Sequence, residues 1–217
     1  MKPTLIYAFD PLCGWCFGFH PIIKRLKIRF ENDLNIKVVP GGLATGENAQ
    51  RINDGHEYIL SAMKRVEEIS DVQFGENFKL LAEEGSYVYN SEPSCRIQNV
   101  VNRLKPDQAL EFAGSLHKAI FVDGENLNLW DTFESLLEDC STDLEEAKFL
   151  YESDEIKKET AEQFEWCTKN GATAFPTLLL HIGDEIGVMS RGYRPFDILE
   201  SHLHHLLNNI KKMQDWD

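Results

Sequence analysis

Apolar and polar positions predict a strand, a helix and a second strand within the first part of the chain. Residues 5–9 are apolar throughout, as in a buried strand, and Asp10-Pro11 ends the run. Residues 36–40 fit a second strand, which a pair of glycines ends. Two strands joined through a helix form a parallel, right-handed unit. The apolar side chains that predict the helix are Phe19, Ile22, Ile23, Leu26 and Phe30.

The middle of the chain then has a helical pattern throughout. Gly171 suits a left-handed cap at the end of the last of these helices, and Thr142 with Glu145 fits a capping box at the start of another. No repeat or low-complexity linker separates this region from its flanks. We expect helices over residues 49–68, 74–84, 93–104, 106–121, 129–139, 144–151 and 155–169.

Strand character returns near the end of the chain, over residues 177–182 and 186–189. Gly183-Asp184 joins these strands in so short a turn that they must be antiparallel. An amphipathic helix over residues 195–211 follows. The predicted fold class is α/β, with a mixed four-stranded sheet and helices on both sides of it.

The region between the two halves of the sheet is predicted to be a separate, acidic insertion. We expect a sheet domain of residues 1–43 and 171–217, and an all-helical insertion domain of residues 44–170. The insertion holds 12 Lys and Arg against 27 Asp and Glu, and the whole chain has a net charge of −14. Such acidity indicates solvated helix faces, or a field around the active site that disfavours acidic partners. Because phosphate binding needs clustered Lys and Arg, a nucleic-acid-binding protein is excluded.

The strongest chemical signal is the tetrapeptide Cys13-Gly14-Trp15-Cys16. It lies where the first strand gives way to the helix, so Cys13 is at or just before the first helical turn. Free backbone N–H groups and the positive end of the helix dipole favour a thiolate there. We therefore expect Cys13 to be the nucleophile of a redox pair. Cys16, one turn further in, is expected to resolve the mixed disulfide that Cys13 forms.

Two other interpretations of this cysteine pair are a zinc site and a pair of core residues. A structural zinc site needs four ligands, and Cys95, Cys140 and Cys167 are isolated in the sequence. His202 and His205 share a helix face without a third ligand at a suitable spacing. A glycine and a tryptophan at such a junction are poor core material. We therefore predict redox chemistry, no metal site, and three further cysteines that are small buried apolar residues.

The sequence also bears on the compartment. No stretch approaches the roughly 20 apolar residues that span a membrane, so no membrane association is expected. Only Lys2 precedes the first strand as a charged residue, and no apolar signal segment comes before the cysteines. We expect a cytoplasmic protein, where glutathione and thioredoxin keep an unstrained dithiol reduced. A reductase or isomerase is therefore favoured over an oxidase.

Two motifs, separated by most of the chain, carry a resemblance to a known family. They are Asp10-Pro11-x-Cys13-Gly14-Trp15-Cys16-x-Gly18 and Phe175-Pro176-Thr177. Together with the order of elements, they resemble the DsbA family of the thioredoxin-fold superfamily, in particular its cytosolic, FrnE-like members. The resemblance covers nearly the whole chain. It implies a thioredoxin-like fold with a large helical insertion, and the activity of a protein-disulfide oxidoreductase or isomerase.

The resemblance also implies roles for the residues around the cysteines. In that family a cis proline faces the cysteine pair, and Pro176 is the matching position. Its loop leaves the backbone of Phe175 free to pair with an extended substrate segment. Trp15 is expected to supply apolar contact to the substrate, or to cover the helix start. The supporting positions are Asp10, Pro11 and Gly14.

This chain departs from the strongly oxidising, exported members of the family. Those members have a His between the cysteines, where this chain has Gly14-Trp15. Without that imidazole, the Cys13 thiolate should be less stabilised and the couple less oxidising. His20 is expected to be a surface or packing residue. The implied partners are protein or small-molecule disulfides and thiols, with no bound cofactor and with glutathione as a candidate co-substrate.

Two further functions fit the same layout. One is a glutathione-dependent isomerase or transferase, similar to the kappa-class branch, whose members typically do not depend on a dithiol. The intact pair of Cys13 and Cys16 argues against it. The other is a redox-responsive adaptor, which presents its acidic insertion to a protein partner and catalyses nothing, because a fold does not determine a function.

Overall fold

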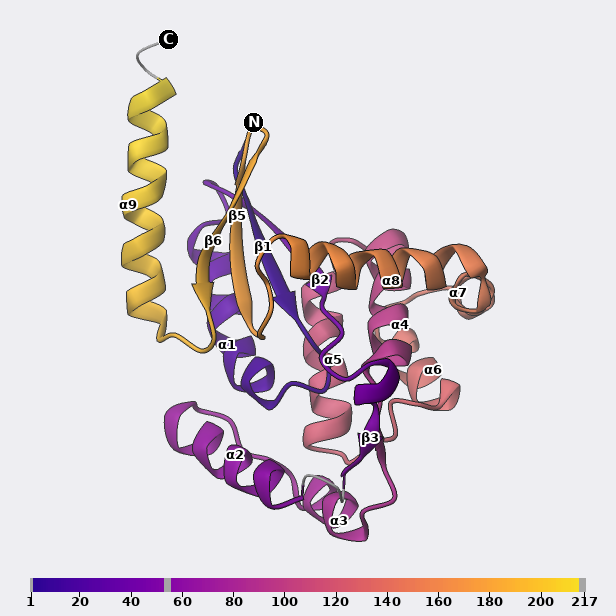
Figure 1. The fold of residues 1–217 in the computed structure, drawn as a ribbon. Helices are drawn as coiled ribbons and strands as arrows, with labels where there is room; N and C mark the ends of the chain where they lie inside the picture. Colours follow the sequence, from indigo (N-terminus) through magenta and orange to yellow (C-terminus); the bar gives the residue numbers. More distant parts are fainter. Residues whose placement is uncertain (1, 53–55, 215–217) are drawn as a thin grey trace.

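A computed structural model describes residues 2–52 and 56–214 of the chain. Its centre is a four-stranded sheet in the order β2-β1-β5-β6 (Figure 1). β1 and β2 are parallel, whereas β5 is antiparallel to both β1 and β6, so the predicted mixed sheet is confirmed. The strands are β1 (Thr4–Phe9), β2 (Asn35–Pro40), β5 (Thr177–Ile182) and β6 (Glu185–Arg191).

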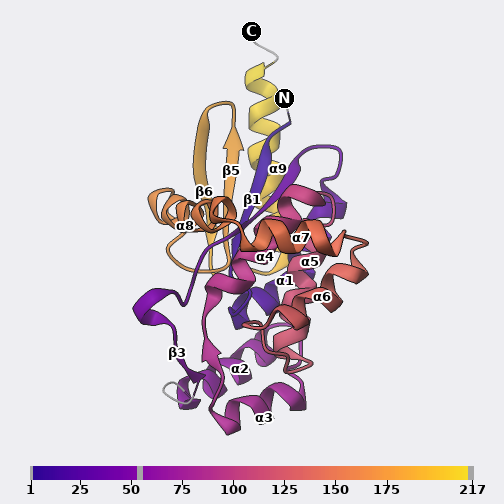
Figure 2. The same ribbon diagram turned by 90° about the vertical axis from the view of Figure 1, so that its right-hand side faces the viewer.

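Side chains of β1 alternate between the two faces of the sheet, and different helices cover each face. Tyr7 lies in the core that the sheet shares with α1 (Gly14–Arg29) and α9 (Phe196–Gln214). Ile6 points the other way and packs in the core beside α8 (Asp154–Lys169). Figure 2 shows α8 in front of the sheet and α9 behind it. The helix that carries the cysteines, α1, thus packs on the same face of the sheet as α9.

The segment between β2 and β5 is largely helical and has a core of its own. This core is rich in aromatic residues, and Phe78, Phe112 and Phe121 are fully or almost fully buried in it. In both views α2 and α3 lie beyond the end of the sheet where α1 begins (Figures 1 and 2). The helices are α2 (His56–Ile69), α3 (Glu76–Glu84), α4 (Ser91–Leu104), α5 (Ala109–Phe121), α6 (Trp130–Asp139), α7 (Leu144–Glu152) and α8.

The prediction of helix from residue 49 onward is wrong at its start. A short 3-10 turn (Gly46–Asn48) is followed by β3 (Gln50–Arg51), which pairs antiparallel with β4 (Val88–Tyr89). Residues 53–55, which the helix was also expected to cover, lie outside the described residues. The backbone N–H of Ile52 donates to the carbonyl of Tyr87 at 2.8 Å, so a distant pairing partner overrides the local pattern.

One predicted cap is also displaced by a residue. Asp143, and not Thr142, caps α7, because its carboxylate accepts a hydrogen bond from the backbone N–H of Glu146 at 2.9 Å. Both residue types are good caps, so the sequence pattern alone did not separate them. The left-handed cap at Gly171 is confirmed, with φ of 81°. Within the described residues, every helix is too short or too polar to cross a membrane.

Candidate active site

Cys13 is the N-cap residue of α1. Its backbone is extended, with φ of −89° and ψ of 107°, and its Sγ accepts a hydrogen bond from the backbone N–H of Cys16 at 3.3 Å. A turn places it there, since the Cys13 N–H donates to the Asp10 carbonyl at 3.0 Å. The first turn of α1 contains no acidic residue, so nothing on the helix itself offsets the positive end of its dipole. The position favours negative charge on Cys13 Sγ.

Cys16 lies in a different environment, although only one helical turn away. It is 0 % exposed, and Cys13 is 5 % exposed. Burial first, and then the neighbouring Cys13, raises the pKa of Cys16 well above its ordinary value. Both cysteines are free thiols in the structure. Cys16 is therefore buried and protonated one helical turn after Cys13, so the two thiols have unequal surroundings.

The loop before β5 closes over Cys13 from the far end of the sequence. The Phe175-Pro176 peptide bond is cis, and the Phe175 carbonyl accepts a hydrogen bond from Cys13 Sγ at 3.5 Å. The Phe175 ring packs against Gly41, where an added Cβ would lie 2.0 Å from the ring. Gly41 thus leaves space for the Phe175 ring, a role that the sequence analysis missed. Two adjacent glycines after a strand were the available signal, because glycine allows such a close approach.

Asp10 is a fully buried carboxylate beneath the cysteine loop. It accepts hydrogen bonds from the backbone N–H groups of Leu12 at 2.8 Å and Leu43 at 2.6 Å. The Ser91 hydroxyl donates to it at 3.0 Å and the Cys95 thiol at 3.7 Å. Burial raises its pKa, while these hydrogen bonds act in the opposite direction. Asp10 therefore ties the cysteine loop to the start of the inserted segment.

Two histidines lie close to the cysteine loop, His20 on α1 itself and His117 on α5. His117 Nε2 is 3.1 Å from the Asp10 carbonyl oxygen, and the rings of His20 and His117 are 6.0 Å apart. Burial lowers the pKa of His20 to about 4 and that of His117 to about 3, so both are neutral at pH 7. His20 was expected to be a surface or packing residue, and its ring contact with His117 fits the packing alternative. Neutral rings add no charge beside the thiols.

Cys13 opens onto a cavity of about 560 Å³, which we call the apolar cavity. Of the predicted site residues, Cys13, Gly14, Trp15 and Phe175 line it, whereas Cys16 and Pro176 do not. Asp10 and Pro11 are buried in the loop that precedes Cys13. The far wall comes from the inserted segment and is mostly apolar, with Ile52, Ile59, Met63, Phe74 and Phe78 among its residues.

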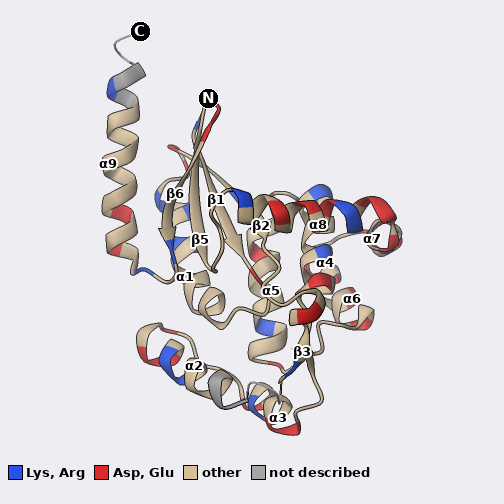
Figure 3. Ribbon diagram, viewed as in Figure 1, with Lys and Arg blue, Asp and Glu red and all other residues tan. Residues whose placement is uncertain are grey.

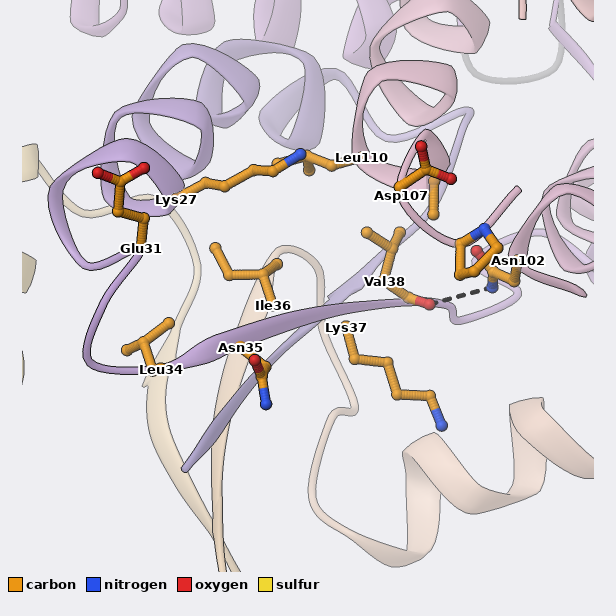
Figure 4. Close-up of a pocket in the computed structure, with 12 residues that line it drawn as sticks. Lys27, Glu31, Leu34, Asn35, Ile36, Lys37, Val38, Asn102, Asp107 and Leu110 are labelled. Atoms are coloured by element: carbon orange, nitrogen blue, oxygen red, sulfur yellow. Dashed lines mark hydrogen bonds between the residues drawn. The ribbon is translucent and has the colours of Figure 1, made fainter. Parts of the chain in front are cut away.

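A second cavity of about 450 Å³ lies between the end of α1, β2 and the connection from α4 to α5 (Figure 4). Among the described residues that line it there is no cysteine or histidine. Its one drawn hydrogen bond, from Asn102 Nδ2 to the Val38 carbonyl at 3.1 Å, holds α4 against β2. The described part of the chain also brings no three His, Cys, Asp or Glu side chains together in a metal-binding group.

Comparisons with known proteins agree with this geometry. A family model described as thioredoxin matches residues 7–201. The ClpXP adapter protein SpxH of Bacillus subtilis is 23% identical over 215 residues, which are 97% of this chain and 70% of that protein. A putative protein disulfide isomerase from Nitrosomonas europaea superposes with a TM-score of 0.86 at 26% identity, over 96% of this chain and 99% of that one.

A cytosolic disulfide reductase, DsbM from Pseudomonas aeruginosa, shares the fold. Its TM-score is 0.74 at 21% identity, over 86% of this chain and 89% of that one. DsbM has also been solved with GSH, and that structure superposes with a TM-score of 0.72. The similar proteins thus include two described by disulfide chemistry and one described as an adapter.

Proposed function

Because the chain belongs to the DsbA-like branch of the thioredoxin family, we propose that it catalyses thiol–disulfide exchange with Cys13 and Cys16. The observation that carries this proposal is the unequal placement of the two thiols. Cys13 caps the helix and lines the apolar cavity, whereas Cys16 is buried and its pKa is raised. A pair of this kind can attack a disulfide in a fixed order.

In the reducing direction, the Cys13 thiolate attacks one sulfur of a substrate disulfide. A mixed disulfide forms, and the first substrate thiolate leaves and takes up a proton. Cys16 then gives up its proton and attacks Cys13 Sγ, which releases the second substrate thiol. The substrate gains two electrons and two protons, and Cys13 and Cys16 become a disulfide. Two molecules of a small thiol such as glutathione would reduce this disulfide again.

The surrounding residues support these steps in the proposal. Trp15 and Phe175 form the walls where the substrate meets Cys13, and the cis bond at Pro176 presents the Phe175 backbone to it. Asp10 and Pro11 hold the loop. Gly14 leaves space for the Phe74 ring, because a Cβ at this position would lie 3.3 Å from it. A reducing, cytosolic setting is part of the proposal, as the description of DsbM states for that protein.

Replacement of the resolving cysteine tests this function. Cys16→Ser should accumulate mixed disulfides through Cys13, because the second attack is removed. Mass spectrometry after incubation with a disulfide-bonded peptide would locate the bond. Cys13→Ser is the matched control and should accumulate none. Equal labelling of the two variants would contradict the proposed order of attack, and catalysis that survives loss of Cys16 would indicate a glutathione-dependent isomerase or transferase.

A protease adapter is the second candidate. The name of the Bacillus subtilis relative, a ClpXP adapter protein, favours an adapter over a dithiol enzyme. An adapter would bind its partner without turnover. The double variant Cys13→Ser/Cys16→Ser should then bind purified ClpXP as tightly as the unmodified protein. Loss of ClpXP binding in the double variant, or no binding by either protein, would contradict a thiol-independent adapter.

A further inference from the structure

A groove of about 330 Å³ lies on the other side of Trp15 and Phe175 from the apolar cavity. We call it the arginine groove. Arg65 of α2, Arg191 of β6 and Arg194 of the loop before α9 line it. In Figure 1, α2 lies below the loop that leads into α9, and these two segments bring the arginines together. Trp15 and Phe175 line both hollows, so they form a ridge between them beside the reactive sulfur.

The three arginines are exposed and available to a partner. No ion pair found among the described residues involves any of them, whereas Arg29, Arg96 and Arg103 are all paired with glutamates. Figure 3 shows acidic residues along α6, α7 and α8, and basic residues at the end of β6 and before α9. Much of the acidity therefore lies on α6, α7 and α8, and no acidic residue is among the described residues that line the groove.

Local contacts hold the groove in shape. The Arg191 Nε donates to the Gly171 carbonyl at 2.7 Å, which orients its guanidinium group. The Tyr193 hydroxyl donates to the Ile69 carbonyl at 3.3 Å, and the Tyr193 ring lies 6.0 Å from that of Trp15. Burial and the nearby carboxylate of Asp71 raise the pKa of Tyr193, so its hydroxyl stays neutral. These contacts connect α2 to the sheet domain across the groove.

The two hollows differ in chemistry, although Trp15 and Phe175 line both of them, and Cys13 lines the apolar cavity. No acidic residue appears among the described residues that line either one. One hollow is mostly apolar, with Arg51 as the charged residue among its described lining, and the other carries three arginines. A chain segment that crosses the ridge with its cysteine at Cys13 would place residues on one side of that cysteine in the apolar cavity. Residues on its other side would then lie on the arginines.

We propose that the arginine groove selects an acidic peptide segment next to the reactive cysteine of a protein substrate. Apolar residues on the other side of that cysteine occupy the apolar cavity. The occupant is an extended peptide, because only a segment that reaches across the Trp15–Phe175 ridge contacts both hollows. This inference rests on the proposed function, and it reverses the expectation that the acidic chain disfavours acidic partners at its active site.

Peptides of equal length test the proposal. Each carries one cysteine as a mixed disulfide with 2-mercaptoethanol, apolar residues on one side and Glu, Gln or Lys residues on the other. The rate constant with the reduced protein should follow the order Glu, Gln, Lys, with about a tenfold difference between the extremes at low salt. This estimate assumes that each exposed ion pair between an arginine and a glutamate changes the rate constant by about two- to fivefold. The difference should shrink at high salt, because salt screens exposed charges. An equal rate for all three peptides would overturn the proposal.

Variants assign the preference to the groove. R65Q/R191Q/R194Q should abolish the order, and R65Q/R194Q should weaken it without removing the Arg191 contact to Gly171. Lys64→Gln is the matched control, because Lys64 is exposed on the same helix and lines neither hollow. An unchanged order in both arginine variants would overturn the proposal. If glutathione disulfide lost as much rate as the Glu peptide in the triple variant, the groove would be a site for a small dicarboxylate instead.

A binding measurement separates this inference from the proposed function. Fluorescence anisotropy with Cys13→Ser and a labelled Glu peptide, whose own cysteine is replaced by serine, needs no exchange chemistry. The Glu peptide should bind more tightly than the Lys peptide, and the arginine substitutions should remove the difference. Reaction of all peptides without any charge preference would support the proposed function and refute the groove. Charge-selective binding without any reaction would support the groove and refute the proposed function.

Discussion

At the scale of single residues, the site depends on the first turn of α1, which places its two cysteines in different surroundings. The Sγ of Cys13 accepts the Cys16 N–H and faces the apolar cavity, so negative charge on it is stabilised and substrate can reach it. Cys16 is fully buried and its pKa is raised, so in the proposed mechanism it is the second thiol to react. The proposed order of attack rests on these surroundings and not on the residue type.

Asp10→Asn tests the buried carboxylate under the cysteine loop. Asn offers one oxygen where Asp10 offers two, so the N–H of Leu12 or Leu43 loses an acceptor. We expect the free energy of unfolding at pH 7 to fall by about 1–3 kcal/mol, as measured with urea. Asp184→Asn, on the exposed turn between β5 and β6, shows whether loss of any carboxylate has this effect.

The stability difference between the unmodified protein and Asp10→Asn should depend on pH. The pKa of Asp10 is raised in the folded protein, so its contribution to stability is complete below its unfolded pKa and is lost as pH rises through the folded pKa. Asp10→Asn does not titrate. The advantage of the unmodified protein over Asp10→Asn should therefore be largest at low pH and decrease toward neutral pH. An advantage that grows as pH rises would refute the assigned direction.

At the scale of elements, the site forms where the ends of three elements meet. These are the start of α1, the end of β2 and the start of β5. The register of β1 with β5 pairs Ala8 with Thr177, which brings the Phe175 loop beside the cysteines. Gly41 ends β2 where the Phe175 ring needs space. Its N–H donates to the Phe9 carbonyl at 2.7 Å, so the backbone there cannot easily move away.

Gly41→Ala should therefore destabilise the protein through the Phe175 loop. The new Cβ would lie 2.0 Å from the ring, and overpacking of this kind costs about 1–3 kcal/mol of unfolding free energy. Gly187→Ala is the control, since its Cβ meets open space, and should change stability by less than about 0.5 kcal/mol. Combining Gly41→Ala with Phe175→Ala should cost less than the sum of the two, and strict additivity would contradict the contact.

The elements themselves were largely predictable, because hydrophobic periodicity carried the information. The strand at Thr177–Ile182 and the helix after Cys13 follow from apolar runs and turn residues. The pairing of β3 with β4 did not follow, since it joins segments far apart in sequence whose local pattern is weak. For the same reason the cysteine motif was visible, whereas the arginine groove was not. Its arginines come from α2 and the β6–α9 region, which only the fold brings together.

At the scale of the whole molecule, the site joins the sheet domain to the inserted segment. Asp10 bonds to Leu43 and Ser91, and Tyr193 bonds to Ile69. The inserted segment supplies the apolar wall of the cavity, and the sheet domain supplies the thiols. The domain boundaries given above stay a prediction. An enzyme would use this joint to hold substrate against Cys13, while an adapter would use the same surface for binding alone.

Turnover distinguishes these two functions and tests the central claim most directly. Reduction of a disulfide-bonded peptide by excess glutathione can be followed by chromatography, with catalytic amounts of the unmodified protein, Cys13→Ser and Cys16→Ser. We predict many turnovers for the unmodified protein and no acceleration by Cys13→Ser, because Cys13 is the one cysteine among the described residues that line the apolar cavity. A rate for the unmodified protein no higher than that for Cys13→Ser would contradict the claim that this dithiol is catalytic.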